Sequence, residues 1–230
     1  MTSVLRCQGL SRHFTTAGSV LEVLRGLDFA LGPGEVVAVL GPSGVGKSTL
    51  LHLLAGLDRP TAGEVYWGEQ PLSALSQNAL AQKRAGLLGL IFQHHYLLED
   101  LTVLDNVTIG GRIQGALDEA RGQALLAQVG LLERARAMPK TLSGGERQRA
   151  AVARSLYGRP RIVLADEPTG SLDRHNARAV YSLLVDLARQ EGSAVVMVTH
   201  DEGLVEDVDA RYHLDGGRLV RERAGALSRA

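Results

Sequence analysis

The segment Gly41 to Thr49, with the sequence GPSGVGKST, constrains the fold of this chain more than any other stretch. It matches the phosphate-binding pattern G-x-x-x-x-G-K-[ST] at every fixed position. A short, largely β-branched apolar run at 35–40 precedes it, and a run of helix-forming residues at 50–55 follows. The segment is therefore expected to join a buried parallel strand to a helix, which predicts an α/β fold.

Each residue type in this segment suits the binding of a nucleoside triphosphate. The glycines at 41, 44 and 46 let the backbone curl so that its N–H groups point at an anion, and the new helix adds its positive dipole end. Lys47 supplies a charge for the β- and γ-phosphates, and the Ser48 hydroxyl is placed to ligate Mg²⁺. The alternative is a glycine-rich turn that only links strand to helix. We predict nucleotide contacts at Gly41, Pro42, Ser43, Gly44, Val45, Gly46, Lys47, Ser48 and Thr49.

Composition restricts the classes of partner and compartment. Lys plus Arg and Asp plus Glu both number 25, so no net field favours nucleic acid or an acidic membrane. The single cysteine, Cys7, excludes an internal disulfide and a cysteine-based zinc site, which suits a reducing cytoplasm. We expect no secretory signal at the N-terminus, because residues 1–14 lack an apolar core, and no membrane span.

The remaining pattern divides the chain into strand-rich and helical parts. Strands are expected at 20–24, 27–31, 64–67, 87–92, 162–165 and 194–198, helices at 72–85 and 176–190, and a hairpin turn at 215–217. Residues 100–157 show no β alternation of any length and are expected to be mostly helical. The sequence predicts a single α/β P-loop NTPase domain of the RecA-like kind with a β-rich flank, over 1–93 and 159–230. A helical subdomain is inserted over 94–158.

A second anion site is predicted at Ser143. Ser143 is a suitable N-cap and Glu146, three residues on, completes a capping box for a helix over 144–157. A capping box alone is common and is little evidence of function. Two glycines in the first turn, Gly144 and Gly145, cost about 1 kcal/mol each relative to alanine. That cost is reasonable where backbone N–H groups approach a ligand closely.

Two acidic residues end the apolar run at 162–165, and they have a chemical as well as a structural interpretation. A buried strand can end in Asp and Glu simply to begin a turn. Beside a phosphate-binding loop, Asp166 is placed to hold Mg²⁺, and Glu167 to orient and deprotonate an attacking water. His200 directly follows the strand at 194–199, where a single histidine would ordinarily be a surface or capping residue. Ligands of parallel sheets bind at the carboxyl ends of the strands, so Gly41, Asp166 and His200 should converge.

The chain resembles the ATP-binding cassette (ABC) ATPases over nearly its whole length. Leu142-Ser143-Gly144-Gly145-Glu146 matches the family signature, and Ser171-Leu172-Asp173 its D-loop. The resemblance implies a head-to-tail homodimer with two ATP molecules between the subunits. Ser143, Gly144, Gly145 and Asp173 of one subunit would then complete the site of the other.

The same resemblance implies roles for three further residues. His200 matches the switch histidine that senses the γ-phosphate, and Gln93 matches the Q-loop glutamine that touches Mg²⁺ or water and relays to a membrane partner. Phe14 lies where the family carries an aromatic residue that stacks on adenine. The alternative for Phe14 is an aromatic of the small-domain core.

Two stretches point to one branch of the family. Residues 56–63 (GLDRPTAG) and 93–98 (QHHYLL) resemble the branch of lipoprotein-releasing, macrolide-export and cell-division ATPases. The resemblance implies a four-helix permease with a large extracytoplasmic domain as partner, and a cytoplasmic location on the inner face of the cell membrane. No nucleic-acid partner is expected. The alternative is a soluble ABC ATPase that acts in the assembly of another complex.

Two other features favour plain interpretations. His94 and His95 could suggest a metal, but adjacent side chains diverge and no matching His or Cys pair exists. The C-terminal arginines could contact acidic lipid, although a solvated chain end is the simpler interpretation. These arginines are Arg218, Arg221, Arg223 and Arg229.

Overall fold

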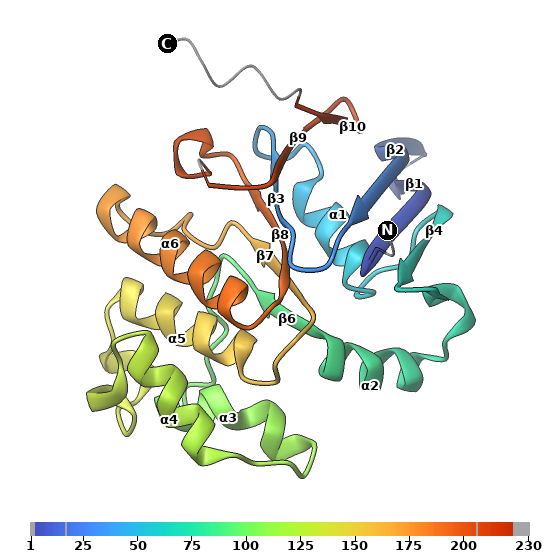
Figure 1. Ribbon diagram of the computed structural model, residues 1–230. Coiled ribbons are helices and arrows are strands. Elements are labelled where there is room, and N and C mark those ends of the chain that lie inside the picture. Colours follow the sequence, from blue (N-terminus) through green and yellow to red (C-terminus); the bar gives the residue numbers. More distant parts are fainter. Residues whose placement is uncertain (1–2, 17, 206, 223–230) are drawn as a thin grey trace.

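The computed structural model describes residues 3–16, 18–205 and 207–222, and these contain two sheets (Figure 1). The first sheet is antiparallel and has the strand order β2-β1-β4-β5. Its strands are β1 (Leu5–Thr16), β2 (Ser19–Leu31), β4 (Ala62–Trp67) and β5 (Gln70–Pro71). This sheet is the β-rich flank that the sequence predicted.

The second sheet is mostly parallel and has the order β10-β9-β3-β8-β7-β6. The neighbours β9, β3, β8, β7 and β6 run parallel, and β10 pairs antiparallel with β9 across the hairpin turn at 215–217. These strands are β3 (Val36–Leu40), β6 (Leu88–Ile91), β7 (Ile162–Asp166), β8 (Ala194–Thr199), β9 (Ala210–Asp215) and β10 (Arg218–Arg221). Every residue of β3, β7 and β8 is buried, as expected for strands covered on both faces.

Helices cover both faces of the parallel sheet (Figure 1). They are α1 (Lys47–Leu54), α2 (Gln77–Leu87), α3 (Val103–Ile113), α4 (Glu119–Gln128), α5 (Gly144–Leu156) and α6 (Arg174–Gln190). Short 3₁₀ turns lie at Leu72–Ala74, Leu132–Arg134, Pro139–Thr141 and Glu202–Leu204. The predicted helix over 72–85 was wrong in its start, because Ser76 caps α2 by accepting a hydrogen bond from Ala79 N.

Alternate residues of β3 belong to two different cores, one on each face of the sheet. Val37 and Val39 pack with α1 and the antiparallel sheet. Val36, Ala38 and Leu40 pack with α3, α4, α5 and α6. Because successive side chains of a strand point to opposite faces, β3 contributes to both cores, and the parallel sheet separates the antiparallel sheet from the helical layer. The described part of residues 100–157 contains helices and turns and no strand, as predicted, while the boundaries 94 and 158 of a helical subdomain stay a prediction.

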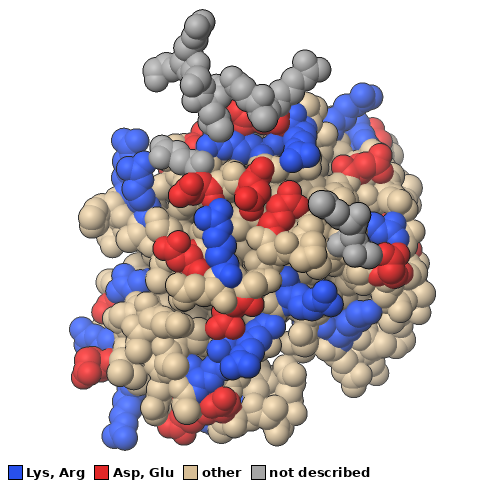
Figure 2. Space-filling model, viewed as in Figure 1, with Lys and Arg blue, Asp and Glu red and all other residues tan. Residues whose placement is uncertain are grey.

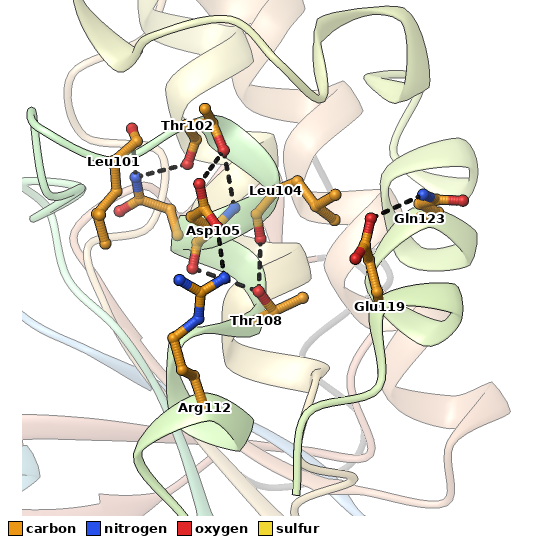
Figure 3. A network of polar contacts seen from close by, with 9 residues as sticks. Leu101, Thr102, Leu104, Asp105, Thr108, Arg112, Glu119 and Gln123 are labelled. Atoms are coloured by element: carbon orange, nitrogen blue, oxygen red, sulfur yellow. Dashed lines mark hydrogen bonds and ion pairs between the residues drawn. The ribbon is translucent and has the colours of Figure 1, made fainter. Parts of the chain in front are cut away.

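Hydrogen bonds of its own residues fix the start of α3 (Figure 3). Thr102 Oγ1 accepts from Asp105 N at 3.1 Å and donates to Asp105 Oδ2 at 2.6 Å. Arg112 then binds Asp105 Oδ1 at 2.7 Å from further along the helix. Thr108 Oγ1 donates to Leu104 O at 2.9 Å. These contacts cap the N-terminus of α3 and link its first turn to its last.

On the face shown in Figure 2, basic and acidic side chains are interspersed. Within the described ranges, no helix is long and apolar enough to cross a membrane. Of the C-terminal arginines, Arg223 and Arg229 lie outside the described residues.

Candidate active site

Four neighbouring parallel strands end at the residues that the sequence singled out. The loop from Gly41 follows β3, Asp166 ends β7, His200 follows β8, and Gln93 lies two residues beyond β6. These strands are adjacent in the order β3-β8-β7-β6. Because parallel strands end at the same edge of a sheet, the order brings all four segments together.

The backbone of the phosphate-binding loop needs glycine at defined positions. Gly41, Gly44 and Gly46 have φ values of 155°, 81° and 110°, which side chains rarely tolerate. A Cβ on Gly41 would lie 2.6 Å from Leu214 O, and one on Gly46 would lie 2.6 Å from Val23 Cγ1. Packing by the same chain therefore fixes the loop, and α1 begins directly after it at Lys47.

Lys47 is almost fully buried and its ammonium group is held by this loop. Nζ donates to Gly41 O at 2.8 Å and to Pro42 O at 3.1 Å. It also lies 3.3 Å from Glu167 Oε1, and the two side chains are 6% and 12% exposed. A buried ammonium needs such partners, and this one is aimed at the inside of the loop.

Ser48 and Asp166 form a pair of oxygen donors. Ser48 Oγ donates to Asp166 Oδ1 at 3.0 Å. Burial raises the pKa of the Asp166 carboxyl, and hydrogen bonding from Ser48 acts against that rise. A hydroxyl and a buried carboxylate fit a small hard cation such as Mg²⁺, whose charge would offset the burial of the carboxylate.

Glu167 contacts two nitrogen groups from other elements, Lys47 at the start of α1 and His200 after β8. His200 Nδ1 lies 3.0 Å from Glu167 Oε2 and 3.1 Å from Oε1, and Lys47 Nζ lies 3.3 Å from the same Oε1. The Glu167 backbone has φ 44°, a strained value for a residue with a side chain, and its N–H donates to Val198 O at 2.9 Å. The strained backbone places one carboxylate where β3, β7 and β8 meet.

Gln93 reaches the same cluster through the turn after Glu167. A Cβ placed on Gly170 would lie 3.3 Å from Gln93 Nε2, and Gly170 N donates to Glu167 O at 3.0 Å. The amide of Gln93 therefore lies against the turn that carries Glu167. The structure thus brings together Lys47, Ser48, Gln93, Asp166, Glu167 and His200.

Ser143 forms the predicted capping box at the start of α5. Ser143 Oγ accepts from Glu146 N at 3.2 Å, and Glu146 Oε2 accepts from Ser143 N at 2.7 Å. A Cβ on Gly144 would lie 3.6 Å from Leu172, and one on Gly145 3.5 Å from Asn176 Oδ1, which are ordinary contacts. Packing within the described chain does not require these two glycines.

Asp173 caps α6 beside the start of α5. Its Oδ1 accepts from His175 N and Asn176 N, both at 3.1 Å. The hydrogen bond from the Asn176 side chain is the main cause that lowers the pKa of Asp173. Within the described ranges, neither Asp173 nor Ser143 makes a hydrogen bond or ion pair with the cluster around Glu167. One chain therefore holds two separate groups of predicted site residues.

Phe14 is not part of the hydrophobic core, so the alternative of a core aromatic was wrong. Its side chain on β1 is 38% exposed. The hairpin of β1 and β2 lies against the phosphate-binding loop, since Val23 of β2 packs against Gly46. Phe14 pairs with Leu21, close to that crossing.

His52 is a neighbour of the site that the sequence analysis missed. It lies on α1 one turn after Ser48, and its charge acts to lower the pKa of Asp166. Its ring lies 6.4 Å from that of Phe92, the residue before Gln93. Because residues four apart lie on the same face of a helix, the spacing from Ser48 could have placed His52 beside the site.

Residues of α3 and α5 hydrogen-bond to the segment after Gln93. The sequence analysis did not predict these contacts. Arg154 donates to the carbonyls of His95 and Tyr96, both at 2.6 Å. The fully buried Asn106 donates to Leu98 O at 3.0 Å and accepts from Leu98 N at 2.7 Å. These contacts join the Gln93 segment to the helical layer.

His95 has a structural partner. Its Nδ1 contacts Gln148 Oε1, and burial is the largest cause that lowers the pKa of the imidazole. Among the residues described, no group of three His, Cys, Asp or Glu side chains could hold a metal ion.

A family model and a curated relative both match most of this chain and indicate the same family. Residues 24–170 match the family described as "ABC transporter". The lipoprotein-releasing system ATP-binding protein LolD of Idiomarina loihiensis is 44% identical over 224 residues, covering 96% of this chain and 98% of that protein.

Solved structures of ABC cassettes have the same fold. The dimeric structure of MJ0796, a bacterial ABC transporter cassette, superposes with a TM-score of 0.87 at 32% identity and covers 96% of this chain and 99% of that one. A dimeric post-hydrolysis state of MJ0796 bound to ADP and Pi gives a TM-score of 0.87 at 31% identity, with coverage of 96% and 99%. CbiO1 from Clostridium perfringens, part of a cbiONQ transporter complex, gives 0.83 at 26% identity, covering 96% of this chain and 88% of that one.

Proposed function

Because the chain belongs to the ABC transporter family and is an ATPase of that family, we propose that it drives a permease of the lipoprotein-releasing type. The convergence of Lys47, Asp166, Glu167 and His200 at one sheet edge supports the ATPase part of this proposal. The 44% identity to LolD over 96% of the chain supports the branch.

We assign the phosphates of ATP to the loop from Gly41 to Thr49 and to the N-terminus of α1. The glycine backbone exposes amides there, and Lys47 is a buried cation within the loop. Phosphate oxygens would replace the carbonyls of Gly41 and Pro42 as partners of the Lys47 ammonium. Phe14 would stack on adenine.

Ser48 and Asp166, with Gln93 at the same edge, would hold Mg²⁺. When bound, the ion supplies positive charge that offsets the charge of the β- and γ-phosphates. The 3.0 Å contact between Ser48 and Asp166 already places two oxygen donors side by side.

Glu167 is the general base in this proposal. Its carboxylate can take a proton from a water that lies in line with the γ-phosphate. Lys47 at 3.3 Å and His200 at 3.0 Å hold the carboxylate in one position. His200 would exchange this contact for the γ-phosphate and so report its presence.

The second group of residues would act on the nucleotide of another copy. Gly144 and Gly145 open the backbone at the start of α5 without being required by the packing of their own chain. A head-to-tail homodimer would place this helix start, with Ser143 and Asp173, against the γ-phosphate held by the partner.

The membrane partner is assigned to the surface formed by the helical layer and the segment around Gln93. A cavity of about 590 Å³ lies on this helical layer between α2, the start of β6, α3 and the end of α5, and Gln93 is not among its lining residues. It is lined by Ala85, Leu90, Ile109, Gln114 and Arg159 among others. We propose that a permease with an extracytoplasmic domain docks on this side and holds the chain at the cytoplasmic face of the membrane.

Co-purification tests the transport function. The tagged chain should enter the membrane fraction, and be captured from detergent extract with a four-span permease, only in cells that express this permease. Capture with a soluble assembly complex instead would favour the non-transport alternative. Membrane binding without any integral protein would favour direct contact with lipid.

A further inference from the structure

Arg12 covers one face of the Phe14 ring. Both residues lie on β1 two positions apart, so their side chains stand on the same face of the sheet. The guanidinium carbon of Arg12 lies 4.6 Å from the centroid of the Phe14 ring. The ring nevertheless stays 38% exposed. It is therefore held by a cation and remains accessible to a ligand.

Arg12 is itself fixed by the segment that follows α1. Its NH2 nitrogen lies 2.9 Å from Asp58 Oδ2 and 3.1 Å from Oδ1. Arg12 Nε is buried and has no hydrogen-bond partner among the described residues, whereas Asp58 forms the hydrogen bond and ion pair of the guanidinium. The Asp58 N–H donates to His52 O at 3.3 Å, which attaches this segment to α1.

The backbone around Arg12 is attached to the same segment. Thr61 N donates to Ser11 O at 2.9 Å, and Thr61 Oγ1 accepts from His13 N at 3.2 Å. A Cβ on Gly63 would lie 2.3 Å from Gly9 O, so the two segments approach as closely as glycine allows. The chain after α1 therefore holds the strand that carries Phe14.

This arrangement lies beside the phosphate-binding loop. Arg12 pairs with Leu24, and both Leu24 and Val23 contact the Cβ position of Gly46. One helix, α1, thus begins at the phosphate-binding loop and ends at the segment that holds Arg12.

We propose that Arg12 is a positioning residue that presents the Phe14 ring to the flat face of a nucleobase, and that Asp58 fixes Arg12 relative to the phosphate-binding loop. The proposal rests on the proposed function, because Phe14 must contact the base. A ring that is already ordered loses less conformational freedom when the base stacks on it. The pair Arg12 and Asp58 would set the distance between base and phosphates.

Binding of ADP and of inorganic pyrophosphate separates this role from a structural one. In Arg12→Gln we expect ADP to bind about 3- to 10-fold more weakly, the range for a lost cation–π contact and a newly mobile side chain. Pyrophosphate, which has no base, should bind as to the wild type. Isothermal titration calorimetry measures both. Asp58→Asn should show the same split with a smaller change and serves as a second variant if Arg12→Gln folds poorly.

Arg6 is the matched control on the same strand. Its guanidinium carbon lies 3.7 Å from the Tyr66 ring centroid, and its NH2 lies 3.5 Å from Glu69 Oε2. Arg6→Gln therefore removes the same two kinds of contact without touching Phe14. ADP affinity should not change in this variant.

A double-mutant cycle completes the test. In the Phe14→Ala background, Arg12→Gln should have no further effect on ADP binding. With Phe14 present, Arg12→Lys should bind ADP more tightly than Arg12→Gln but more weakly than the wild type. Equal loss of ADP and pyrophosphate binding, or an undiminished loss in Phe14→Ala, would overturn the proposal. If Phe14→Ala alone leaves ADP affinity intact, the positioning role fails while the ATPase assignment to Lys47 and Glu167 stands.

Discussion

Glycines occur both in the phosphate-binding loop and in the first turn of α5, but for different reasons. At Gly41 and Gly46 a Cβ would come within 2.6 Å of other atoms of the chain, and both residues have positive φ. At Gly144 and Gly145 a Cβ would fit at ordinary distances of 3.6 and 3.5 Å. The loop is thus shaped by its own chain.

From this comparison we propose that one chain carries the two halves of a site. Lys47, Asp166 and Glu167 already contact one another or Ser48 within the chain. The start of α5 is capped but contacts none of them in the described part of the chain. In our proposal, a ligand held by a second copy accounts for the two glycines at this helix start.

The largest expected effect is on ATP hydrolysis by the group of Lys47, Asp166 and Glu167. Glu167→Gln keeps the size of the side chain and removes the base, so the steady-state ATPase rate should fall about 10²- to 10⁴-fold. That loss corresponds to about 3–5 kcal/mol of barrier. ATP binding should persist, because Lys47 and the loop amides are unchanged. Glu202→Gln, an exposed glutamate after β8, is the control. A wild-type rate in Glu167→Gln would move the base elsewhere, with His200 tested first.

The next effect is on nucleotide binding. Lys47→Ala removes the buried cation of the loop and leaves Glu167 without its 3.3 Å partner. We expect ATP affinity to fall about 100-fold, or ~3 kcal/mol, as for a lost charged hydrogen bond. Circular dichroism should show an unchanged fold. Lys140→Ala is the control, and equal ATP binding by Lys47→Ala and Lys140→Ala would refute the loop assignment.

Two alanine substitutions compare the glycines directly. Gly46→Ala should lower Tm by about 2–8 °C, because a left-handed residue costs about 1–2 kcal/mol even before overlap with Val23. Gly145→Ala should leave Tm equal or higher, since alanine favours a helix by about 1 kcal/mol. Its ATPase rate should nevertheless fall. A stable and fully active Gly145→Ala would break the comparison.

The smallest expected effect is a pH dependence at Asp166. Burial raises its folded-state pKa above the ordinary value of 3.8. The folded state then holds the proton more tightly than the unfolded state, so the ionised carboxylate lowers stability as the pH rises through that pKa. Asp166→Asn should therefore unfold at a higher temperature than the wild type at pH 7 in EDTA. The difference should shrink as the pH falls through that pKa. A difference that is constant with pH would contradict this sign.

Much of this site was predictable because its residues lie in short contiguous motifs. The strand before Gly41 and the strand that ends at Asp166 are short, unbroken apolar runs followed by polar residues, so both strands and the loops after them were predictable. The contact between Lys47 and Glu167 was not predictable from spacing, since it depends on β8 lying between β3 and β7.

Other features depend on tertiary contacts that no local pattern records. Arg12 and Asp58 are 46 positions apart in sequence and meet where the segment after α1 hydrogen-bonds to β1 through Thr61. Asn106 looks like an ordinary helical asparagine, yet it is fully buried and holds Leu98. Such polar side chains are identified by burial, which the sequence does not give.

The central claim is that two copies complete each site, and the mass of Glu167→Gln in ATP tests it most directly. Without hydrolysis, ATP should hold two chains together, and light scattering after size exclusion should give twice the 24.5 kDa of one chain. With ADP the mass should be that of a monomer. Adding Ser143→Arg should abolish the dimer while each chain still binds ATP. A Glu167→Gln protein that binds ATP and stays monomeric, or a dimer that Ser143→Arg leaves intact, would contradict the account.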